Sequence, residues 1–583
     1  MKIVFVNPYC LDPRLQDYDI KVVPIGVYYM AACLIEAGHS CEILNWYDMK
    51  GRDEDMAKIL RDLRPDILAV SILHANRWGG IDIAKIAKKI SSETFVIFGG
   101  PGATFLWEHL LNHFPEIDAI VVGEGEETMM ELVSEMDGGN ISEWRNIPGL
   151  ALRHNQKPML TAKRDFIKDL DTLADPAKHF SFNHVISSRG CPWNCYFCGS
   201  PRIWERKVRF HSPSYFVSQL RRLNKKGQRF FFVSDDTFTL KKDRVISICK
   251  EIISSKMDIE WVAISRVNIV DDEILYWMRR AGCIQISYGV ESGSSRIRKR
   301  LNKNISDDEI TRAFEATRSY GIMPRAYFIY GSPGETKKTI SESIRLMKRI
   351  KPLGAIFYIL DIFPGTKLYD DFKKRTGKSD DIWLNRIEDI MYFETDDGLD
   401  EKKVLEFGKR LRTAFYSNLP SWAKNIQLKD LPELAPHQSS FLARLGLTFT
   451  YGDYSTVKAV PQKEQTAKGL FKRALTIFPN EVAYLGLAIM YQKNDQHTKA
   501  VDLLEEGLKH FPASSQLQGC LGVSLMQLGR LEEALELFLR TEPSVKNLSY
   551  AYRCAYALGN MHLCSRIANK LKSLEKTVTK SPN

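Results

Sequence analysis

The chain has 583 residues, of which 44% are hydrophobic and 26% charged, and its net charge is +11. At this length we expect about three or four domains, and the apolar content excludes global disorder because each domain can bury a core. Residues 1–150 contain 13 Lys and Arg against 23 Asp and Glu, a net −10, and the remainder carries +21. The total charge therefore does not by itself indicate a nucleic-acid partner.

No part of the sequence has the pattern of an export signal or a membrane span. The apolar stretch that begins at Ile3 ends at Val6, and no uncharged apolar run approaches the roughly 18 residues that cross a bilayer. The eleven cysteines are scattered and do not form a small disulfide framework. We therefore expect a cytoplasmic protein whose cysteines are reduced unless they bind metal.

Residues 1–150 alternate short apolar runs with stretches of helical periodicity. This alternation predicts an α/β domain with a doubly wound parallel sheet of the Rossmann type. Gly99-Gly100-Pro101-Gly102 directly follows a strand, at the edge where such sheets bind ligands. The basic, turn-rich segment 151–182 is predicted to be a linker. The expected strands are Ile3–Val6, Cys41–Leu44, Ile67–Ser71, Phe95–Phe98 and Ala119–Val122, with helices over Tyr28–Ala37 and Ile81–Ile90.

A second series of alternating strands and helices occupies residues 183–395. Six such units in about 200 residues predict a parallel barrel, whole or partial, whose loops at the carboxyl ends of the strands hold the site. The expected strands begin near His184–Ser188 and continue with Arg229–Ser234, Glu260–Ser265, Cys283–Val290, Arg325–Tyr330 and Ala355–Asp361.

The last part of the chain is predicted to be helical. Residues 396–460 are an amphipathic and irregular connection, and residues 461–583 contain an internal repeat. Ala500 and Ala534 are 34 residues apart, which is the period of tetratricopeptide helix pairs, where small residues let neighbouring helices pack closely. An unrelated helical bundle is the alternative to such repeats.

The most specific motif is Cys191-Pro-Trp-Asn-Cys195-Tyr-Phe-Cys198. Three thiolates in one loop can bind three irons of a cubane cluster and leave the fourth iron open to a reacting molecule. Zinc and a disulfide are the alternatives. A structural zinc site uses four protein ligands, and His211, the next candidate, has no recognised spacing. A disulfide is disfavoured in the cytosol, and the other cysteines are isolated and are expected to be small buried hydrophobes.

This loop resembles that of the radical S-adenosylmethionine (radical SAM) enzymes, in which Cys-x3-Cys-x2-Cys follows the first barrel strand and an aromatic residue, here Phe197, precedes the last cysteine. The resemblance implies that Cys191, Cys195 and Cys198 hold a 4Fe–4S cluster. It also implies that the open iron chelates the amino and carboxylate groups of S-adenosylmethionine, which one electron from the cluster then splits to yield a 5′-deoxyadenosyl radical.

Later strand ends resemble the segments that contact S-adenosylmethionine in the same family. They are Phe231–Phe238 near the methionine moiety, Tyr288–Gly293 near the ribose or amino group, Phe328–Thr336 near adenine, and Phe363–Thr366 after the sixth strand. Arg266 ends the third strand and is expected to pair with a carboxylate of the cofactor or with an anionic substrate. The residues implied to bind S-adenosylmethionine are Asp235, Asp236, Arg266, Gly289, Glu291, Gly331 and Pro333.

The N-terminal domain resembles the flavodoxin-like, cobalamin-binding domain of a large subgroup of radical SAM enzymes. The resemblance rests on Pro24–Ala32, Ser71-Ile72-Leu73, Gly99-Gly100-Pro101 and Gly123–Glu126. The nucleotide tail of cobalamin needs a slot beside a parallel sheet, and small residues at strand ends would open it. The residues implied to bind cobalamin are Gly26, Ser71, Leu73, Gly99, Gly100, Gly123 and Glu124.

The domain departs from one known cobalamin motif. The sequence lacks Asp-x-His-x-x-Gly, whose histidine binds cobalt, and His39 and His74 are expected to be structural or exposed. The resemblance therefore implies cobalamin without a protein histidine ligand. A domain that keeps the fold but has lost the cofactor is the alternative.

Together these resemblances imply a cobalamin-dependent radical SAM enzyme, and foremost a methyltransferase that acts on an unactivated carbon or a phosphorus centre. Anaerobic oxidative cyclisation and rearrangement use the same architecture and are alternatives. A tRNA methylthiotransferase is disfavoured, because Cys10, Cys33 and Cys41 do not show the arrangement that binds that family's second cluster. A non-enzymatic repeat scaffold is the remaining alternative. No general acid or base is assigned, because hydrogen-atom abstraction needs none.

The expected partners follow from the same assignment. They are a small-molecule or lipid-like substrate, an electron donor such as flavodoxin or ferredoxin, and a protein that binds the repeats, unless the repeats pack on the catalytic core. The acidic first domain and the basic second domain are expected to attract each other. We therefore interpret the positive charge as a difference between domains, and nucleic acid is not an expected partner.

Overall fold

The structure, a computed structural model, describes residues 1–12, 21–139 and 141–578. The chain forms two compact units, the first made of most of residues 1–412 and the second of residues 413 onward with two short segments, 314–324 and 351–354. Residues 579–583 of the predicted repeat region lie outside the described part. Within the described ranges, no helix is long and apolar enough to cross a membrane.

The first sheet has seven strands in the order β2-β1-β3-β4-β5-β6-β7, and β1 to β5 are parallel. The order 2-1-3-4-5 is that of flavodoxin-like folds and reverses between β1 and β3, where such sheets bind ligands. The predicted strands all form. They are β1 (Lys2–Asn7), β2 (Ser40–Asn45), β3 (Ile67–Ser71), β4 (Phe95–Gly99) and β5 (Ala119–Val121), followed by β6 (Leu150–His154) and β7 (Lys157–Leu160).

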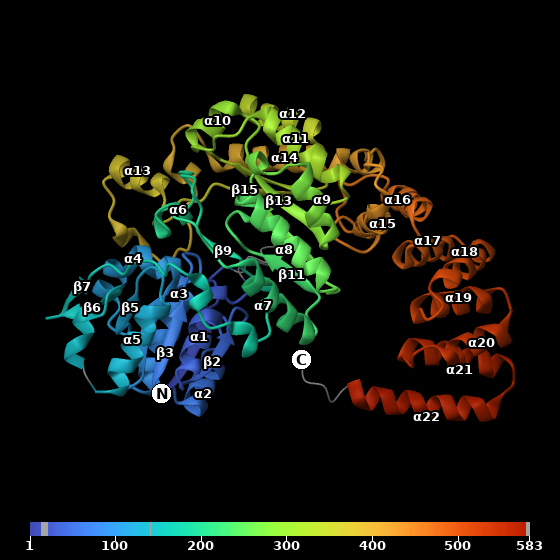
Figure 1. Cartoon of the computed structure of the whole chain (residues 1–583), viewed down its shortest axis with the longest axis horizontal. Helices are drawn as coiled ribbons and strands as arrows, with labels where there is room; N and C mark the ends of the chain where they lie inside the picture. The colour runs from blue at the N-terminus through green and yellow to red at the C-terminus, as the bar shows by residue number, and fades with distance from the viewer. Residues whose placement is uncertain (13–20, 140, 579–583) are drawn as a thin grey trace. The chain divides into compact units, whose positions relative to one another are not determined.

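Helices cover both faces of this sheet (Figure 1). Side chains alternate along a strand, so Val4 and Val6 of β1 enter one core and Ile3 and Phe5 enter the other. On one face lie α1 (Ile25–Glu36) and α5 (Glu126–Asp137), and on the other α2 (Asp53–Leu63), α3 (Arg77–Ile90) and α4 (Gly100–His113). Because β1 is buried on both sides, its sequence is a continuous apolar run.

Residues 151–182 are expected to be a linker. In the first part of this segment the structure instead has an antiparallel hairpin, formed by β6 and β7, on the edge of the first sheet. Asn155 and Gln156 both have positive φ, as a tight hairpin turn requires. One of the basic residues of this segment, Arg153, anchors the hairpin. Its guanidinium donates hydrogen bonds to the carbonyl oxygens of Leu111, Phe114 and Ile117 near the end of α4.

The second sheet has six strands in the order β15-β14-β13-β12-β11-β8, with β8 and β15 at opposite edges, which is the partial barrel that the sequence predicts. The strands are β8 (His184–Val185), β11 (Phe230–Val233), β12 (Glu260–Ser265), β13 (Cys283–Glu291), β14 (Met323–Tyr330) and β15 (Gly354–Ile359). The intervening helices are α7 (Pro213–Lys225), α8 (Lys242–Ser254), α9 (Asp272–Arg280), α10 (Ser295–Arg300), α11 (Asp307–Ser319) and α12 (Lys337–Ile350).

The first barrel strand is shorter than expected. Residues 184–188 do not form one strand, because the chain leaves the sheet after Val185 and Ser188 pairs elsewhere. There β9 (Ser188–Arg189) forms a two-stranded antiparallel ribbon with β10 (Arg209–Phe210). The ribbon leads directly into the cysteine motif.

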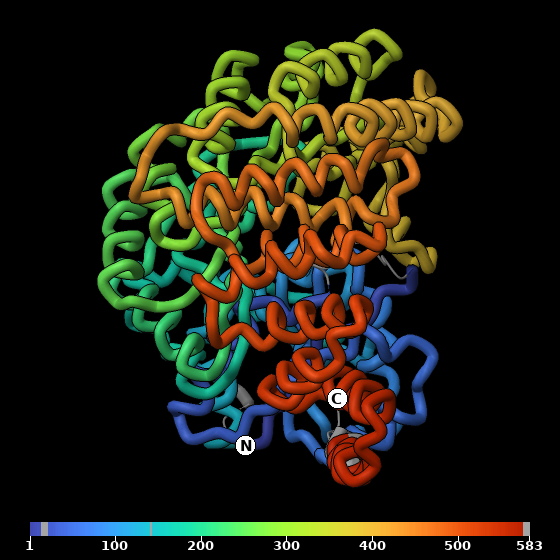
Figure 2. The backbone as a smooth tube through the Cα atoms, turned by 90° about the vertical axis from the view of Figure 1, so that its right-hand side faces the viewer, coloured from blue at the N-terminus to red at the C-terminus, as the bar shows by residue number. Residues whose placement is uncertain are grey.

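The second unit is helical, and in the C-terminal stack each helix packs against the next (Figure 2). The helices α19 and α20 begin 34 residues after α17 and α18, which reproduces the predicted period, and Ala500 and Ala534 are both fully buried. The helices are α17 (Glu481–Lys493), α18 (His497–His510), α19 (Ser515–Gln527), α20 (Leu531–Arg540), α21 (Val545–Ala557) and α22 (Met561–Val578). The irregular connection that precedes the repeats contains α14 (Glu401–Lys424) and α15 (Ala435–Thr450), and α16 (Lys463–Ile477) follows it.

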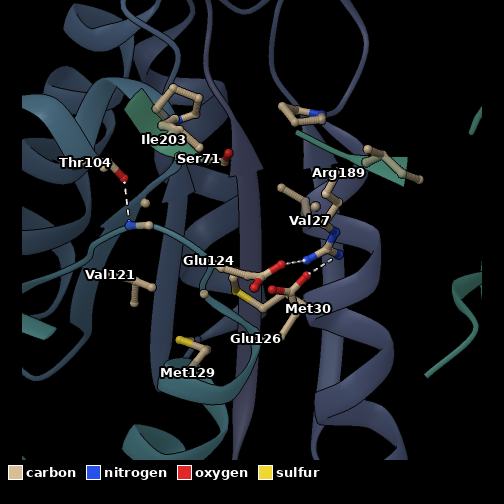
Figure 3. A pocket seen from close by; sticks show the side chains of 18 of the residues that line it. Val27, Met30, Ser71, Thr104, Val121, Glu124, Glu126, Met129, Arg189 and Ile203 are labelled. Carbon is tan, nitrogen blue, oxygen red and sulfur yellow. Dashed lines mark hydrogen bonds and ion pairs between the residues drawn. The ribbon is translucent and has the colours of Figure 1, made fainter. Parts of the chain in front are cut away.

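A buried ion-pair cluster joins the two sheets of the first unit (Figure 3). The Arg189 side chain is 5% exposed, and its two terminal nitrogens lie 2.6 Å from a Glu124 oxygen and 2.7 Å from a Glu126 oxygen. Arg209 of the neighbouring strand lies 2.7 Å from Glu124. The glutamates follow β5 in the acidic domain and the arginines belong to the basic one, so the contact agrees with the expected attraction.

Replacing Glu126 by Gln should destabilise the first unit strongly. The change leaves the buried Arg189 with one carboxylate, and breaking a buried pair costs about 3 kcal/mol or more. The adjacent Glu127→Gln is the matched control, because Glu127 is 53% exposed in its pair with Arg164 and such pairs contribute less than about 1 kcal/mol. The free energy of unfolding in urea measures both, and equal losses in the two variants would contradict the buried-pair argument.

Candidate functional site

A cavity of about 290 Å³ lies at the carboxyl ends of β1, β3, β4 and β5, where the strand order reverses. Apolar side chains that include Met30, Val121 and Met129 line one part of it (Figure 3). Barrel residues, among them Ser188, Gly190 and Asp236, line another part. Of the residues expected to bind cobalamin, the cavity is lined by Gly26, Ser71, Gly99, Gly100, Gly123 and Glu124.

Leu73 is the one residue of that set that is not among the lining residues. Its backbone N–H donates to the Asn76 side chain at 2.8 Å. The two histidines that are expected to be structural or exposed have neighbours outside the cavity. The His39 ring lies 3.4 Å from the amino-terminal nitrogen, and His74 packs against Trp383. Neither histidine lines the cavity.

The two adjacent glycines at the start of α4 have different roles. Gly99 has an extended backbone, and a Cβ placed on it would have only the Val121 carbonyl oxygen, 4.0 Å away, within van der Waals reach. A side chain there would enter open space, so Gly99 keeps part of the cavity empty. Gly100 has φ +87°, and its Cβ would lie 2.7 Å from the Ile72 carbonyl oxygen. Gly100 therefore lets α4 approach β3 closely.

Glu124 lines the cavity, but its carboxylate is already occupied. It accepts hydrogen bonds from Arg189, from Arg209 and, at 2.9 Å, from the backbone N–H of Ile167. Arg189 also lines the cavity, and no sequence motif singles it out. Its only signal in the sequence is its position between a strand and the Gly-Cys pair.

The cysteine motif forms a loop without helix or strand between β9 and α6 (Ser200–Ile203). It starts at Gly190, which has φ +100° and whose Cβ would lie 2.1 Å from the Lys207 carbonyl oxygen, so the turn requires glycine. The Tyr196 N–H donates to the Leu301 carbonyl oxygen at 3.1 Å. These contacts hold the loop in place against the barrel.

The three thiols of the motif lie in one loop and are buried or partly buried. None of the eleven cysteines, all of which lie in the described ranges, forms a disulfide. Burial raises the pKa of the Cys198 thiol to about 12 and also raises the pKa of Cys191, so a thiolate here needs a cation beside it. An Arg266 nitrogen lies 3.8 Å from the Cys195 sulfur, and its guanidinium lies over the Trp193 ring. Arg266 therefore faces the cysteine loop.

Asp235 and Asp236, the paired carboxylates after β11, have different surroundings. Asp235 is buried and accepts three hydrogen bonds of 2.6 Å, from the N–H and hydroxyl of Ser187 and the hydroxyl of Ser188. Asp236 instead lines the cavity and accepts a hydrogen bond from the Ser200 hydroxyl at 2.7 Å. Asp235 thus fixes the chain that leads into the cysteine loop, and only Asp236 faces the cavity.

Glu291 at the end of β13 is held by a lysine that no motif indicates. The Lys303 ammonium lies 2.8 Å from the Glu291 carboxylate, and both side chains are buried. Glu291 has φ +62°, a conformation that costs free energy in a residue other than glycine. A Cβ at Gly289 would lie 2.2 Å from a Glu291 carboxylate oxygen, so glycine at this position leaves room for the ion pair.

At the end of β14, a further carboxylate organises the turn that contains Gly331 and Pro333. Glu335 accepts hydrogen bonds from the N–H groups of Gly331, at 2.5 Å, and Ser332, at 3.2 Å, through the same oxygen. Its other oxygen is buried and, within the described residues, has no hydrogen-bond partner. Burial raises the pKa of Glu335 to about 7. The residue lies inside the Phe328–Thr336 segment but is not among the residues that the resemblance implies.

Comparisons with known proteins agree with this geometry. The Radical SAM superfamily model matches residues 185–347 and the B12 binding domain model matches residues 16–133. An uncharacterized methyltransferase of Pyrococcus horikoshii is 33% identical over 382 residues, which cover 64% of this chain and 83% of that protein. An anaerobic magnesium-protoporphyrin IX monomethyl ester cyclase of Cereibacter sphaeroides is 28% identical over 417 residues, 67% of each chain.

Solved structures are similar to this chain over most of its length. One of them is the radical S-adenosylmethionine methyltransferase TsrM from Kitasatospora setae with cobalamin and a [4Fe-4S] cluster bound, and it matches with a TM-score of 0.61 at 14% identity. The match covers 81% of this chain and 99% of that one. At this identity it shows a shared fold.

Glu335→Gln should flatten the pH dependence of stability. The folded-state pKa of Glu335 is raised from 4.5 to about 7, so its stabilising contribution is complete below pH 4.5 and is lost as the pH rises through about 7. That loss is about 3 kcal/mol, and glutamine does not titrate. Unfolding free energies of both proteins at pH 5 and pH 8 measure it, and parallel profiles would show that Glu335 does not titrate in this range.

Proposed function

Because the chain belongs to the radical SAM enzymes that carry a B12-binding domain, we propose that it is a methyltransferase acting on an unactivated carbon or a phosphorus centre of a small molecule. The observation that carries this proposal is the shared cavity, which is lined both by the strand ends of the first sheet and by Gly190 and Asp236 beside the cysteine loop. When bound, the cluster supplies the electron that cleaves S-adenosylmethionine, and the cobalamin carries the methyl group.

Cys191, Cys195 and Cys198 are the proposed cluster ligands. Their thiols share one loop, and the buried thiols require a cation to ionise, which iron provides. The Arg266 guanidinium beside Cys195 adds a positive charge that offsets the thiolates. In this proposal Arg266 stabilises the cysteine loop through its positive charge. Its contact with a carboxylate of the cofactor stays a prediction.

For S-adenosylmethionine we propose the strand ends that the sequence indicates, together with two added residues. Asp236 faces the cavity, and Lys303 orients Glu291 for contact with the ribose or amino group. Glu335 fixes the Gly331–Pro333 turn through its hydrogen bonds from the N–H groups of Gly331 and Ser332. Asp235 is proposed to position the cysteine loop.

For cobalamin we propose the cavity wall formed by Gly26, Ser71, Gly99 and Gly123, with Met30 and Met129 as apolar contacts. Glycine at position 99 leaves space that a side chain would fill, which fits a slot for the nucleotide tail. A domain that had lost the cofactor would have no need to keep this space.

Oxidative cyclisation is the second candidate function, and a specific match favours it, namely the 28% identity to the Cereibacter cyclase. Methyl transfer is preferred because the relative with 33% identity is named a methyltransferase. A tRNA methylthiotransferase loses support, because the B12-binding match occupies the region where such an enzyme would carry its second cluster. A non-enzymatic repeat scaffold loses support because of the radical SAM match.

The proposal extends to partners and location. The cluster needs an electron donor such as flavodoxin or ferredoxin, and the helical repeats offer a surface for a protein partner. Free thiols at all eleven cysteines favour a reducing compartment, for which we propose the cytoplasm.

Methyl transfer predicts that label moves from S-adenosylmethionine to product. The protein is reconstituted anaerobically with iron, sulfide and cobalamin and given a reductant, methyl-deuterated S-adenosylmethionine and a small-molecule extract of cells that lack its gene. Mass spectrometry should find a deuterated product together with 5′-deoxyadenosine. Deoxyadenosine with an unlabelled product would overturn methyl transfer and favour cyclisation or rearrangement.

Two variants should separate the cofactor sites. Cys198→Ser should lose most of the iron, about four atoms per chain, and keep cobalamin, whereas Gly99→Leu should lose cobalamin and keep iron because its side chain fills the cavity. Cys33→Ser and Gly99→Ala are the matched controls and should retain both. Iron analysis and the visible cobalamin spectrum provide the measurements, and unchanged cobalamin in Gly99→Leu would place that cofactor elsewhere.

A further inference from the structure

A second group of metal-ligand side chains lies at the far end of α4 from the cavity. His109 and His113 are one turn apart on this helix and therefore share a face. Asp381 approaches them from a short 3-10 helix, η7 (Asp380–Leu384), in the segment that follows the barrel sheet. One ligand atom from each of the three side chains lies within 4.8 Å of the others.

The three side chains converge on one carboxylate oxygen. The Asp381 oxygen lies 3.1 Å from Nε2 of His113 and 3.6 Å from Nδ1 of His109. The two imidazole rings have centroids 4.9 Å apart. Small side-chain adjustments would therefore place two nitrogens and one oxygen around a common centre.

A separate observation at this place is a buried imidazole without a hydrogen-bond partner among the described residues. His109 is 6% exposed, and among the described residues neither of its ring nitrogens has a hydrogen-bond partner. Buried polar groups are nearly always paired, and leaving one unpaired costs free energy. The Asp381 contact at 3.6 Å is too long to be a hydrogen bond, so the imidazole has capacity for a ligand.

We propose that His109, His113 and Asp381 bind a divalent transition-metal ion, with zinc the best fit. Two imidazole nitrogens and one carboxylate oxygen are a usual zinc donor set, whereas magnesium and calcium prefer oxygen ligands alone. The Asp381 side chain is 62% exposed and that of His113 is 35% exposed, so water can complete the coordination. The inference does not depend on the proposed methyl transfer.

The ion would fasten the segment after the barrel to the first sheet's helix layer. That segment already contacts the same layer, because Arg77 of α3 donates to the Ile387 carbonyl oxygen and Arg386 pairs with Asp82. Since α4 begins at Gly100 on the cavity wall and ends at His113, a metal at its far end would hold the helix that forms part of that wall.

The test uses Co²⁺ as a spectroscopic probe in the full-length chain. The three motif cysteines are replaced by Ala, because their thiolates would also bind the ion. We expect about one equivalent of Co²⁺ with visible d–d bands and without the near-ultraviolet bands of thiolate ligation. His113→Ala and Asp381→Asn should each abolish this binding, and both residues are exposed enough for the variants to fold.

Glu108→Gln is the matched control, because Glu108 is an exposed carboxylate on the same helix outside the group, and it should retain the Co²⁺ equivalent. A second measurement is the zinc content of the protein with intact cysteines, which should fall by about one atom per chain in Asp381→Asn. Absence of Co²⁺ binding, or stoichiometric binding unaffected by either variant, would overturn the proposal.

Discussion

The position of the cavity depends on one requirement. The charge of the buried Arg189 guanidinium must be neutralised by carboxylates within the protein. Its carboxylates, Glu124 and Glu126, follow β5 of the first sheet, and Arg189 ends the ribbon that leads into the cysteine loop. A lone charge in this position would be very costly, so the two sheets have to meet here. The chain passes through Gly190 immediately afterwards, and the cysteine loop is therefore placed beside the strand ends of the first sheet.

Hydrophobic patterning predicted the strands well where at least one face of a strand is fully buried. The bounds of β3 and β12 agree with the expected ranges Ile67–Ser71 and Glu260–Ser265, because a continuous or alternating apolar run ends where burial ends. It failed at the hairpin of β6 and β7, which contains polar residues and whose outer strand, β7, forms the edge of the sheet. The positive charge of Arg153 is satisfied by carbonyl groups at the end of α4, a partnership that no local pattern contains.

The residues of the candidate site also fall into two groups, those that the local sequence predicts and those that it does not. The cysteine motif and Gly99 follow from local spacing, since a loop of eight residues or a glycine at a strand end has its effect close by. The carboxylates do not, because a carboxylate at a strand end can face the cavity or an internal partner. Asp235 is bound by Ser187 and Ser188, and Glu291 by Lys303. These partners lie outside the motifs. The sequence therefore indicates which acidic residues are candidates for binding S-adenosylmethionine, but it does not show which of their carboxylates are already bound by other residues of the chain.

The C-terminal helices have a different physical character from the rest of the molecule. From α17 to α22 each helix packs mainly on its sequence neighbours, so the stability of the stack is close to a sum of local interfaces. The buried side chains form one cluster that extends along the stack, and each inner helix contributes to the interfaces on either side of it. The stack can bend by small rotations spread over many interfaces. We therefore expect the C-terminal helices to deform by bending. The flavodoxin-like sheet and the barrel, by contrast, are held together by the buried ion pairs of Arg189 with Glu124 and Glu126.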